Sequence, residues 1–101
     1  MNALRKLHRA VLRVAPSLGA AVASAAVDGE IDGPEAGLRA LDAIGDPAVQ
    51  GFQPAWTTRA HLLAEVGRPA EAADAYRRAI ELTADPGVAE YLSRRLRRMT
   101  C

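Results

Sequence analysis

The chain has 101 residues, of which half are apolar and only 4% are aromatic, and its formal net charge is +1. This length suits one domain with a modest core, and the near-neutral charge favours no class of partner. The single cysteine, Cys101, excludes an intrachain disulfide, and no apolar run approaches the roughly 18 residues that span a bilayer. Because alanine dominates the apolar residues and strand-favouring residues are sparse, composition predicts an all-α protein. Without a membrane-spanning run, we expect the protein in the cytoplasm.

Proline and glycine divide the N-terminal half into three segments of helix length. Residues 2–14 carry apolar side chains at helical spacing between basic ones, which indicates an amphipathic helix and not a targeting peptide. The second helix is predicted over 17–28 and should end at Gly29, because glycine suits a C-terminal cap. A longer turn over 29–33 would follow. The third helix, over 34–45, begins with proline in its first turn, where proline is favoured.

The C-terminal half predicts a longer connection over 47–53 and then three more helices. Their expected ranges are 54–66, 69–83 and 86–99. The last of them carries an apolar stripe at spacings of four, four and three: Val88, Leu92, Leu96 and Met99. A stripe of this kind is stable only when another element covers it, so we expect this helix to close the array.

An internal repeat of about 34 residues organises these helices. A small residue, a large one four positions later and an apolar one three positions after that recur along the chain. The three sets are Ala3, Leu7 and Ala10, then Gly37, Leu41 and Ile44, then Ala72, Tyr76 and Ala79. The small side chain admits a neighbouring helix and the large one fills the groove beside it. The pattern predicts one domain over 1–101, with about two and a half helical hairpins and a C-terminal capping helix.

Residues 54–84 resemble a tetratricopeptide repeat (TPR). The matching positions are Trp56, Ala60, Leu63, Gly67, Ala72, Tyr76 and Ala79. Two positions depart from the repeat, because Arg59 stands where leucine is usual and Ala84 where proline is usual. The resemblance implies a TPR-like array in which Trp56 belongs to the core.

Three stretches are similar to the C-terminal extension of one group of bacterial extracytoplasmic-function (ECF) RNA polymerase sigma factors. They are LHRAVLRVAPS (7–17), VDGEIDGPEAGLRALDAI (27–44) and TRAHLLAEVGRPAEAADAYRRAIELTADPGVAEYLSRRLRRM (58–99). The resemblance implies an accessory domain that modulates transcription initiation by contacting the sigma-factor core regions, RNA polymerase or a regulatory protein. The two DNA-reading and core-binding sigma regions are not in these 101 residues, so promoter recognition is assigned to no residue here. A freestanding TPR adaptor unrelated to transcription is the alternative.

Two groups of polar residues are candidate partner-binding sites. Thr57, His61 and Glu65 recur at four-residue spacing and share one helical face, which in TPR geometry would look into the groove. The arginines of the last helix form a basic patch: Arg94, Arg95, Arg97 and Arg98. Either group could instead be an ordinary solvated face. Contact of the patch with nucleic acid would depend on charge alone, because only Tyr91 among its neighbours could stack on a base.

No motif indicates catalysis. The pair His61 and Glu65 invites a metal or acid–base role, but no second histidine or cysteine lies nearby and the HExxH spacing is missing. Phosphate-binding glycine loops and a nucleophile elbow are missing from the sequence too. We therefore expect no enzyme activity, no cofactor, no metal and no small-molecule substrate, and we expect the protein to act by binding another protein.

Overall fold

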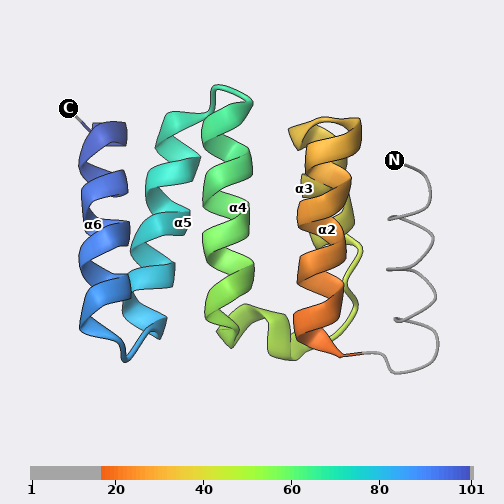
Figure 1. Ribbon diagram of the computed structural model, residues 1–101, viewed down its shortest axis with the longest axis horizontal. Coiled ribbons are helices and arrows are strands. Elements are labelled where there is room, and N and C mark those ends of the chain that lie inside the picture. The colour runs from red at the N-terminus through yellow and green to blue at the C-terminus, as the bar shows by residue number, and fades with distance from the viewer. Residues whose placement is uncertain (1–16, 101) are drawn as a thin grey trace.

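The computed structural model describes residues 17–100, and every regular element in this part of the chain is helical (Figure 1). The elements are α2 (Leu18–Asp32), α3 (Pro34–Asp42), the 3₁₀ helix η1 (Pro47–Gly51), α4 (Gln53–Glu65), α5 (Pro69–Leu82) and α6 (Pro86–Thr100). The all-α class is confirmed for the described residues. The helix predicted over 2–14 lies outside them.

Consecutive α-helices run in opposite directions and pack side by side, so that the chain folds back on itself at each turn (Figure 1). α2 packs on α3, α4 packs on α5, and α6 packs on the outer side of α5. The two hairpins are joined through contacts of both α2 and α3 with α4. The described part of the chain is therefore a row of helical hairpins ending in a single helix.

Short polar side chains and prolines determine where the helices begin. The Ser17 hydroxyl accepts a hydrogen bond from the Ala20 N–H at 3.0 Å and so caps α2. The Asp85 carboxylate accepts one from the Gly87 N–H at 2.8 Å at the start of α6. Proline occupies the first or second position of α3, α4 and α5 and the first position of α6. These starts agree with the predicted ones to within a residue, because proline tolerates the first turn and no later one.

The predicted end of the second helix at Gly29 is wrong. α2 continues to Asp32, and Gly33, with φ of +99°, is the residue between α2 and α3. Gly29 is buried inside the helix, where an added Cβ would lie 2.7 Å from Cδ2 of Leu62. Gly29 therefore permits close helix packing and does not terminate the helix, and the predicted longer turn over 29–33 does not exist.

The end of the third helix and the connection after it also differ from the sequence prediction, whereas the remaining boundaries agree to within one residue. α3 ends at Asp42 and not at residue 45, because the chain turns at Ala43 and Ile44. The predicted connection over 47–53 contains η1, whose first turn is capped by the Asp46 carboxylate accepting from the Ala48 N–H at 2.9 Å. α4 then begins at Gln53, one residue earlier than expected.

The core consists mainly of alanine and leucine side chains around one aromatic residue. Tyr76 and Leu92 are the largest fully buried side chains. The repeat positions Gly37, Leu41, Ala72, Tyr76 and Ala79 are all buried, and Ile44 is half-buried against the core. Around Leu92 the other members of the predicted stripe, Val88, Leu96 and Met99, are half-buried against the same core, which is how α6 covers α5.

Trp56 lies beside the core and not within it. Its side chain is half-buried, packs on the core from the edge of α4, and donates from Nε1 to the Gln50 carbonyl oxygen at 2.9 Å. Arg59, one turn further on, forms an ion pair of 2.9 Å with Asp42 of α3. This ion pair joins the two hairpins.

Candidate functional site

A shallow hollow of about 150 Å³ lies between α2 and α4. Its lining comprises Ala26, Gly29 and Glu30 of α2 and Thr58, His61, Leu62 and Glu65 of α4. His61 and Glu65, two of the three predicted groove residues, thus line one concave surface. Thr57 does not line this hollow; its hydroxyl accepts a hydrogen bond from Gln53 Nε2 at 2.6 Å.

Helix geometry explains why Thr58 replaces Thr57 at this surface. Residues spaced strictly by four drift around a helix by about 40° per step, whereas steps of three and four together stay on one side. The lining residues of α4 follow that mixed spacing from Thr58 through His61 to Glu65. Sequence reasoning could have found Thr58 by testing both spacings.

His61, on α4, is half-buried and faces Tyr76 of α5 and Arg95 of α6. Its ring meets the ring of Tyr76 edge-on, with centroids 5.6 Å apart and planes at 63°. Burial is the main cause that lowers the pKa of His61 below 6.5; the positive charge of Arg95 lowers it further, and Glu65 opposes both. The neutral ring is therefore favoured at neutral pH. Its Nε2 is buried and has no hydrogen-bond partner among the described residues.

Arg95 of α6 lies between two tyrosines. Its guanidinium carbon is 6.0 Å from the ring centroid of Tyr91, within the range of a cation–π contact. The pKa of Arg95 is raised above its usual value. The nearby Tyr76 hydroxyl is the largest cause and raises it, desolvation lowers it, and Tyr91 raises it. The geometry at the Tyr76 hydroxyl is too poor for a hydrogen bond, since this buried oxygen has no partner among residues 17–100. The contact between Arg95 and Tyr76 is therefore electrostatic.

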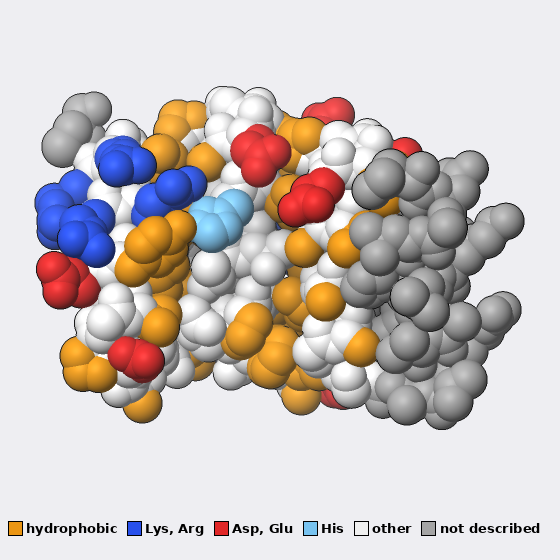
Figure 2. Space-filling model, in the orientation of Figure 1, with side chains coloured by type: hydrophobic (Ala, Val, Ile, Leu, Met, Phe, Trp, Pro, Cys, Tyr) orange, Lys and Arg blue, Asp and Glu red, His pale blue; other side chains and the backbone are white. Residues whose placement is uncertain are grey.

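The two predicted sites are neighbours in the structure. Arg95 on α6 is close enough to His61 on α4 for its positive charge to lower the pKa of the histidine. The groove residues and the basic patch therefore share one surface. Figure 2 shows the histidine near the middle of this face, with the basic side chains gathered toward α6 and acidic side chains both toward α2 and below the basic ones on the α6 side. Nothing in the linear sequence joins His61 and Arg95, which are 34 positions apart.

Three arginines of the predicted basic patch form a row with Tyr91. Tyr91, Arg94, Arg95 and Arg98 are spaced by three and four and lie on one side of α6. Arg97 follows Arg94 by three positions, so it borders this row beside Arg94 and lies about 160° around the helix from Arg95. Tyr91, with 43% of its surface exposed, is the exposed large apolar side chain of the described residues and belongs to the arginine row. Its spacing of four from Arg95 is the signal that could have identified it.

The charges of α6 are less compensated than those of α5. The arginines of α5 and of the turn before it all have carboxylate partners: Arg68 with Glu71 at 2.6 Å, Arg77 with Asp74 at 2.8 Å and Arg78 with Glu81 at 3.4 Å. On α6, Arg94 has a long pair of 3.8 Å with Glu90. Within the described part of the chain no ion pair involves Arg95, Arg97 or Arg98.

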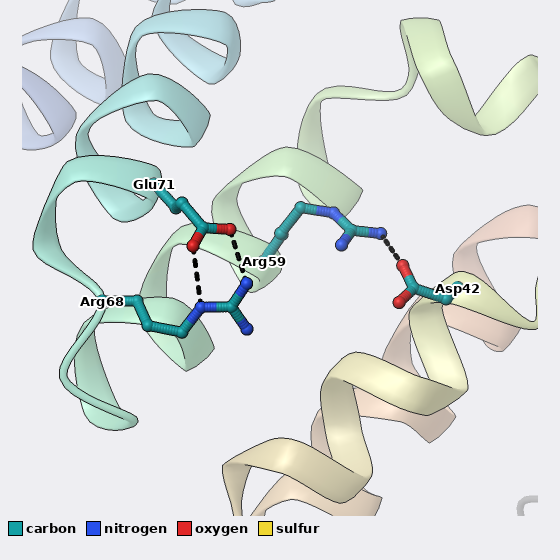
Figure 3. A network of polar contacts seen from close by, with 4 residues as sticks. All are labelled: Asp42, Arg59, Arg68 and Glu71. Atoms are coloured by element: carbon teal, nitrogen blue, oxygen red, sulfur yellow. Dashed lines mark hydrogen bonds and ion pairs between the residues drawn. The ribbon is translucent and has the colours of Figure 1, made fainter.

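A second cleft of about 450 Å³ lies between α3, α4 and α5. Its apolar lining is formed by Leu38, Trp56, Leu63 and Ala75. Its rim carries the Asp42–Arg59 ion pair and the Arg68–Glu71 pair, in which both Nε and Nη2 of the arginine donate to the carboxylate (Figure 3). Because these rim charges pair with one another, the cleft offers no net charge to a ligand.

Among residues 17–100 no group of three or more histidine, cysteine, aspartate or glutamate side chains is placed to hold a metal ion. None of the described helices is long and apolar enough to cross a membrane. No known family model, curated protein or solved structure matches the chain significantly. The inference of function therefore rests on the chemistry of the surface and on the sequence resemblance.

Proposed function

We propose that this chain is a TPR-like protein-interaction module and that its contact surface is the face shared by α2, α4 and α6. The observation that carries the proposal is the cluster of His61, Tyr91 and Arg95 on two helices. These side chains lie outside the apolar core, with Tyr91 exposed and Arg95 held beside it. Ordered aromatic and arginine side chains at a surface are the residues that contribute most to protein–protein binding.

The packing of the two described hairpins supports the TPR-like part of the proposal. The small residues Gly37 and Ala72 are buried at equivalent positions of α3 and α5, each followed four positions later by a buried large residue. In such an array the first helices of successive hairpins line one face, which here means α2 and α4, continued by α6. The hollow between α2 and α4 lies on that face.

We further propose that the module is the accessory C-terminal domain of an ECF sigma factor and that it modulates transcription initiation in the bacterial cytoplasm. Three stretches of sequence support this: 7–17, 27–44 and 58–99, which resemble that extension. A freestanding TPR adaptor is the alternative, and it requires the same contact surface. In both cases the module binds protein and catalyses no reaction.

Binding to purified components tests the proposal. If the coding frame upstream of Met1 continues into sigma regions, these regions are produced separately and titrated with the 101-residue chain by isothermal calorimetry; core RNA polymerase is the second ligand. We expect binding to one of them, weakened by Tyr91→Ala. The matched control is Arg39→Ala, an exposed residue on α3, away from the proposed face. A Tyr91→Ala chain that binds as tightly as the original would contradict the assignment of this face.

A gel-shift assay with duplex DNA is the counter-test. Tight, sequence-selective DNA binding by this chain would overturn the interaction-module proposal. Weak binding that disappears with modest salt would leave it intact, because a few clustered arginines suffice for such binding. Binding to neither sigma regions nor polymerase would favour the freestanding adaptor over the sigma accessory domain.

A further inference from the structure

We infer that the row Tyr91, Arg94, Arg95 and Arg98, called the α6 basic row below, binds an acidic segment of the partner protein, with Arg95 as its central contact. The inference rests on the proposed function, since it names the chemistry of the partner at the same surface. It is independent of whether that partner belongs to the transcription machinery.

The missing intramolecular partners are the first argument. Each arginine of α5 is neutralised by a carboxylate one turn away, whereas Arg95 and Arg98 have no ion pair among the described residues. Arg94 retains only the long pair with Glu90. The arginines of the α6 basic row are therefore less compensated by carboxylates of the described chain than those of α5, and they are available to an external carboxylate.

Preorganisation of Arg95 is the second argument. The Arg95 side chain as a whole is half-buried, and the contact of its guanidinium with Tyr91 limits the positions that it can adopt. A guanidinium held in this way presents a planar set of donors that fits a carboxylate with two parallel hydrogen bonds. Fixing it before binding reduces the side-chain entropy lost on association. Tyr91, exposed beside it, offers apolar contact area to a side chain next to the acidic one.

The dimensions of the row define the segment that fits. From Tyr91 to Arg98 the helix rises by about 10 Å, which is two turns. A partner helix with acidic residues at intervals of three and four therefore places its carboxylates along the row at the same pitch. The partner is expected to carry acidic residues on one helical face, with an apolar residue between them to contact Tyr91.

The surroundings of the row favour acidic protein over nucleic acid. Glu30 and Glu65 line the hollow next to His61, and they would repel a phosphate backbone that continued from α6 across the face. A protein segment can present a basic residue to these two glutamates and acidic residues to the arginines. Duplex DNA presents phosphates everywhere, and three arginines release too few counterions to hold it at physiological salt.

Fluorescence anisotropy with a labelled peptide tests the inference. The probe is a fluorescein-labelled helical peptide with glutamates on one face and leucine between them, titrated with the full chain at physiological salt. Its control is the same peptide with glutamine in place of every glutamate. We expect the acidic peptide to bind and the glutamine peptide to bind at least about tenfold more weakly, because charge-assisted hydrogen bonds are lost.

Variants of the protein locate the contact. Arg95→Gln and, separately, the exposed Arg98→Glu should each weaken binding of the acidic peptide by about tenfold. Arg77→Gln, which removes an exposed, paired arginine of α5, should change binding less than twofold. Circular dichroism verifies that each variant is folded, and the exposed position of Arg98 keeps the test valid if Arg95→Gln proves unstable.

Three outcomes would overturn the inference: equal binding of the acidic and glutamine peptides, unchanged affinity in Arg98→Glu, or tighter binding of a duplex DNA probe than of the acidic peptide. Failure here is distinguishable from failure of the proposed function. If sigma regions or polymerase bind with dependence on Tyr91 while the acidic peptide does not bind, the interaction module stands and only the acidic chemistry of its partner is wrong.

Discussion

The close approach of α2 and α3 at Gly29 and Gly37 predicts how replacement of each α2 and α3 glycine by alanine changes the stability. Glycine inside a helix costs about 0.5–1 kcal/mol relative to alanine, so replacement with alanine stabilises a helix wherever there is room. At Gly19 of α2 there is room, because an added Cβ would lie 4.0 Å from the Phe52 ring. Gly19→Ala should therefore stabilise the protein by about 0.5 kcal/mol.

The same replacement at the two packed glycines meets different obstacles. At Gly29 the nearest atom, 2.7 Å away, is a terminal methyl of Leu62, which can turn aside. At Gly37 the added methyl lies 3.0 Å from both the Ala25 carbonyl oxygen and the Gly29 Cα. These are backbone atoms, so α2 and α3 must separate. Overpacking of this kind costs about 1–3 kcal/mol, and subtracting the helix gain leaves a net loss of about 0–2 kcal/mol.

Urea unfolding followed by circular dichroism measures all three variants on one scale. The expected order of unfolding free energy is Gly19→Ala above the unmodified chain, Gly29→Ala close to it, and Gly37→Ala below it. A loss of 1 kcal/mol lowers the melting temperature by about 4–8 °C in a domain of this size. If Gly37→Ala were as stable as Gly19→Ala, α2 and α3 would not be in backbone contact at this position and the argument would be refuted.

Three further predictions follow from the core and from His61. Ala72→Leu should cost about 1–3 kcal/mol, because Ala72 is fully buried, whereas Asp74→Leu at an exposed position should cost under about 0.5 kcal/mol by urea unfolding. Truncation after Thr83 removes the helix that carries Leu92, so the melting temperature should fall and the chain should associate in analytical ultracentrifugation. Burial and Arg95 lower the pKa of His61 in the folded state below 6.5. The free energy of unfolding is therefore highest above pH 6.5 and falls as the pH decreases from 6.5 toward the lower folded pKa, because the unfolded chain then binds a proton that the folded chain does not. His61→Gln should remove this pH dependence.

Each of these predictions has its own contrary result. Equal losses in Ala72→Leu and Asp74→Leu would mean that the repeat register is wrong. A truncated chain that melts like the full one and remains monomeric would show that α6 covers nothing essential. For His61, unfolding free energies of the unmodified chain and His61→Gln are compared between about pH 5 and 7. The control is His8→Gln, which removes the other histidine of the sequence. A pH dependence that persists in His61→Gln would assign it to other groups.

Local chemistry made much of the helical architecture predictable from the sequence. Prolines mark the first turns of four helices, and the apolar positions repeat at the helical period, so the existence of the helices followed from residues close together in the chain. The burial of Tyr76 and Ala72 also followed, because a small residue and a large one four positions later describe one face of one helix. These are properties of single helices, and a single sequence contains them.

Tertiary packing decided the features that depend on two helices meeting. The local chemistry of Gly29 favours the end of a helix. In the structure Gly29 lies inside α2, because Gly37 and Leu62 occupy the space where a side chain would be. The candidate site has the same origin. His61 and Arg95 belong to separate predicted groups, and they form one surface only because α4 and α6 both pack on α5. Helical periodicity specifies which residues share a face, but the position of one face beside another is determined by how closely the helix axes approach, and that distance depends on the small residues buried between them.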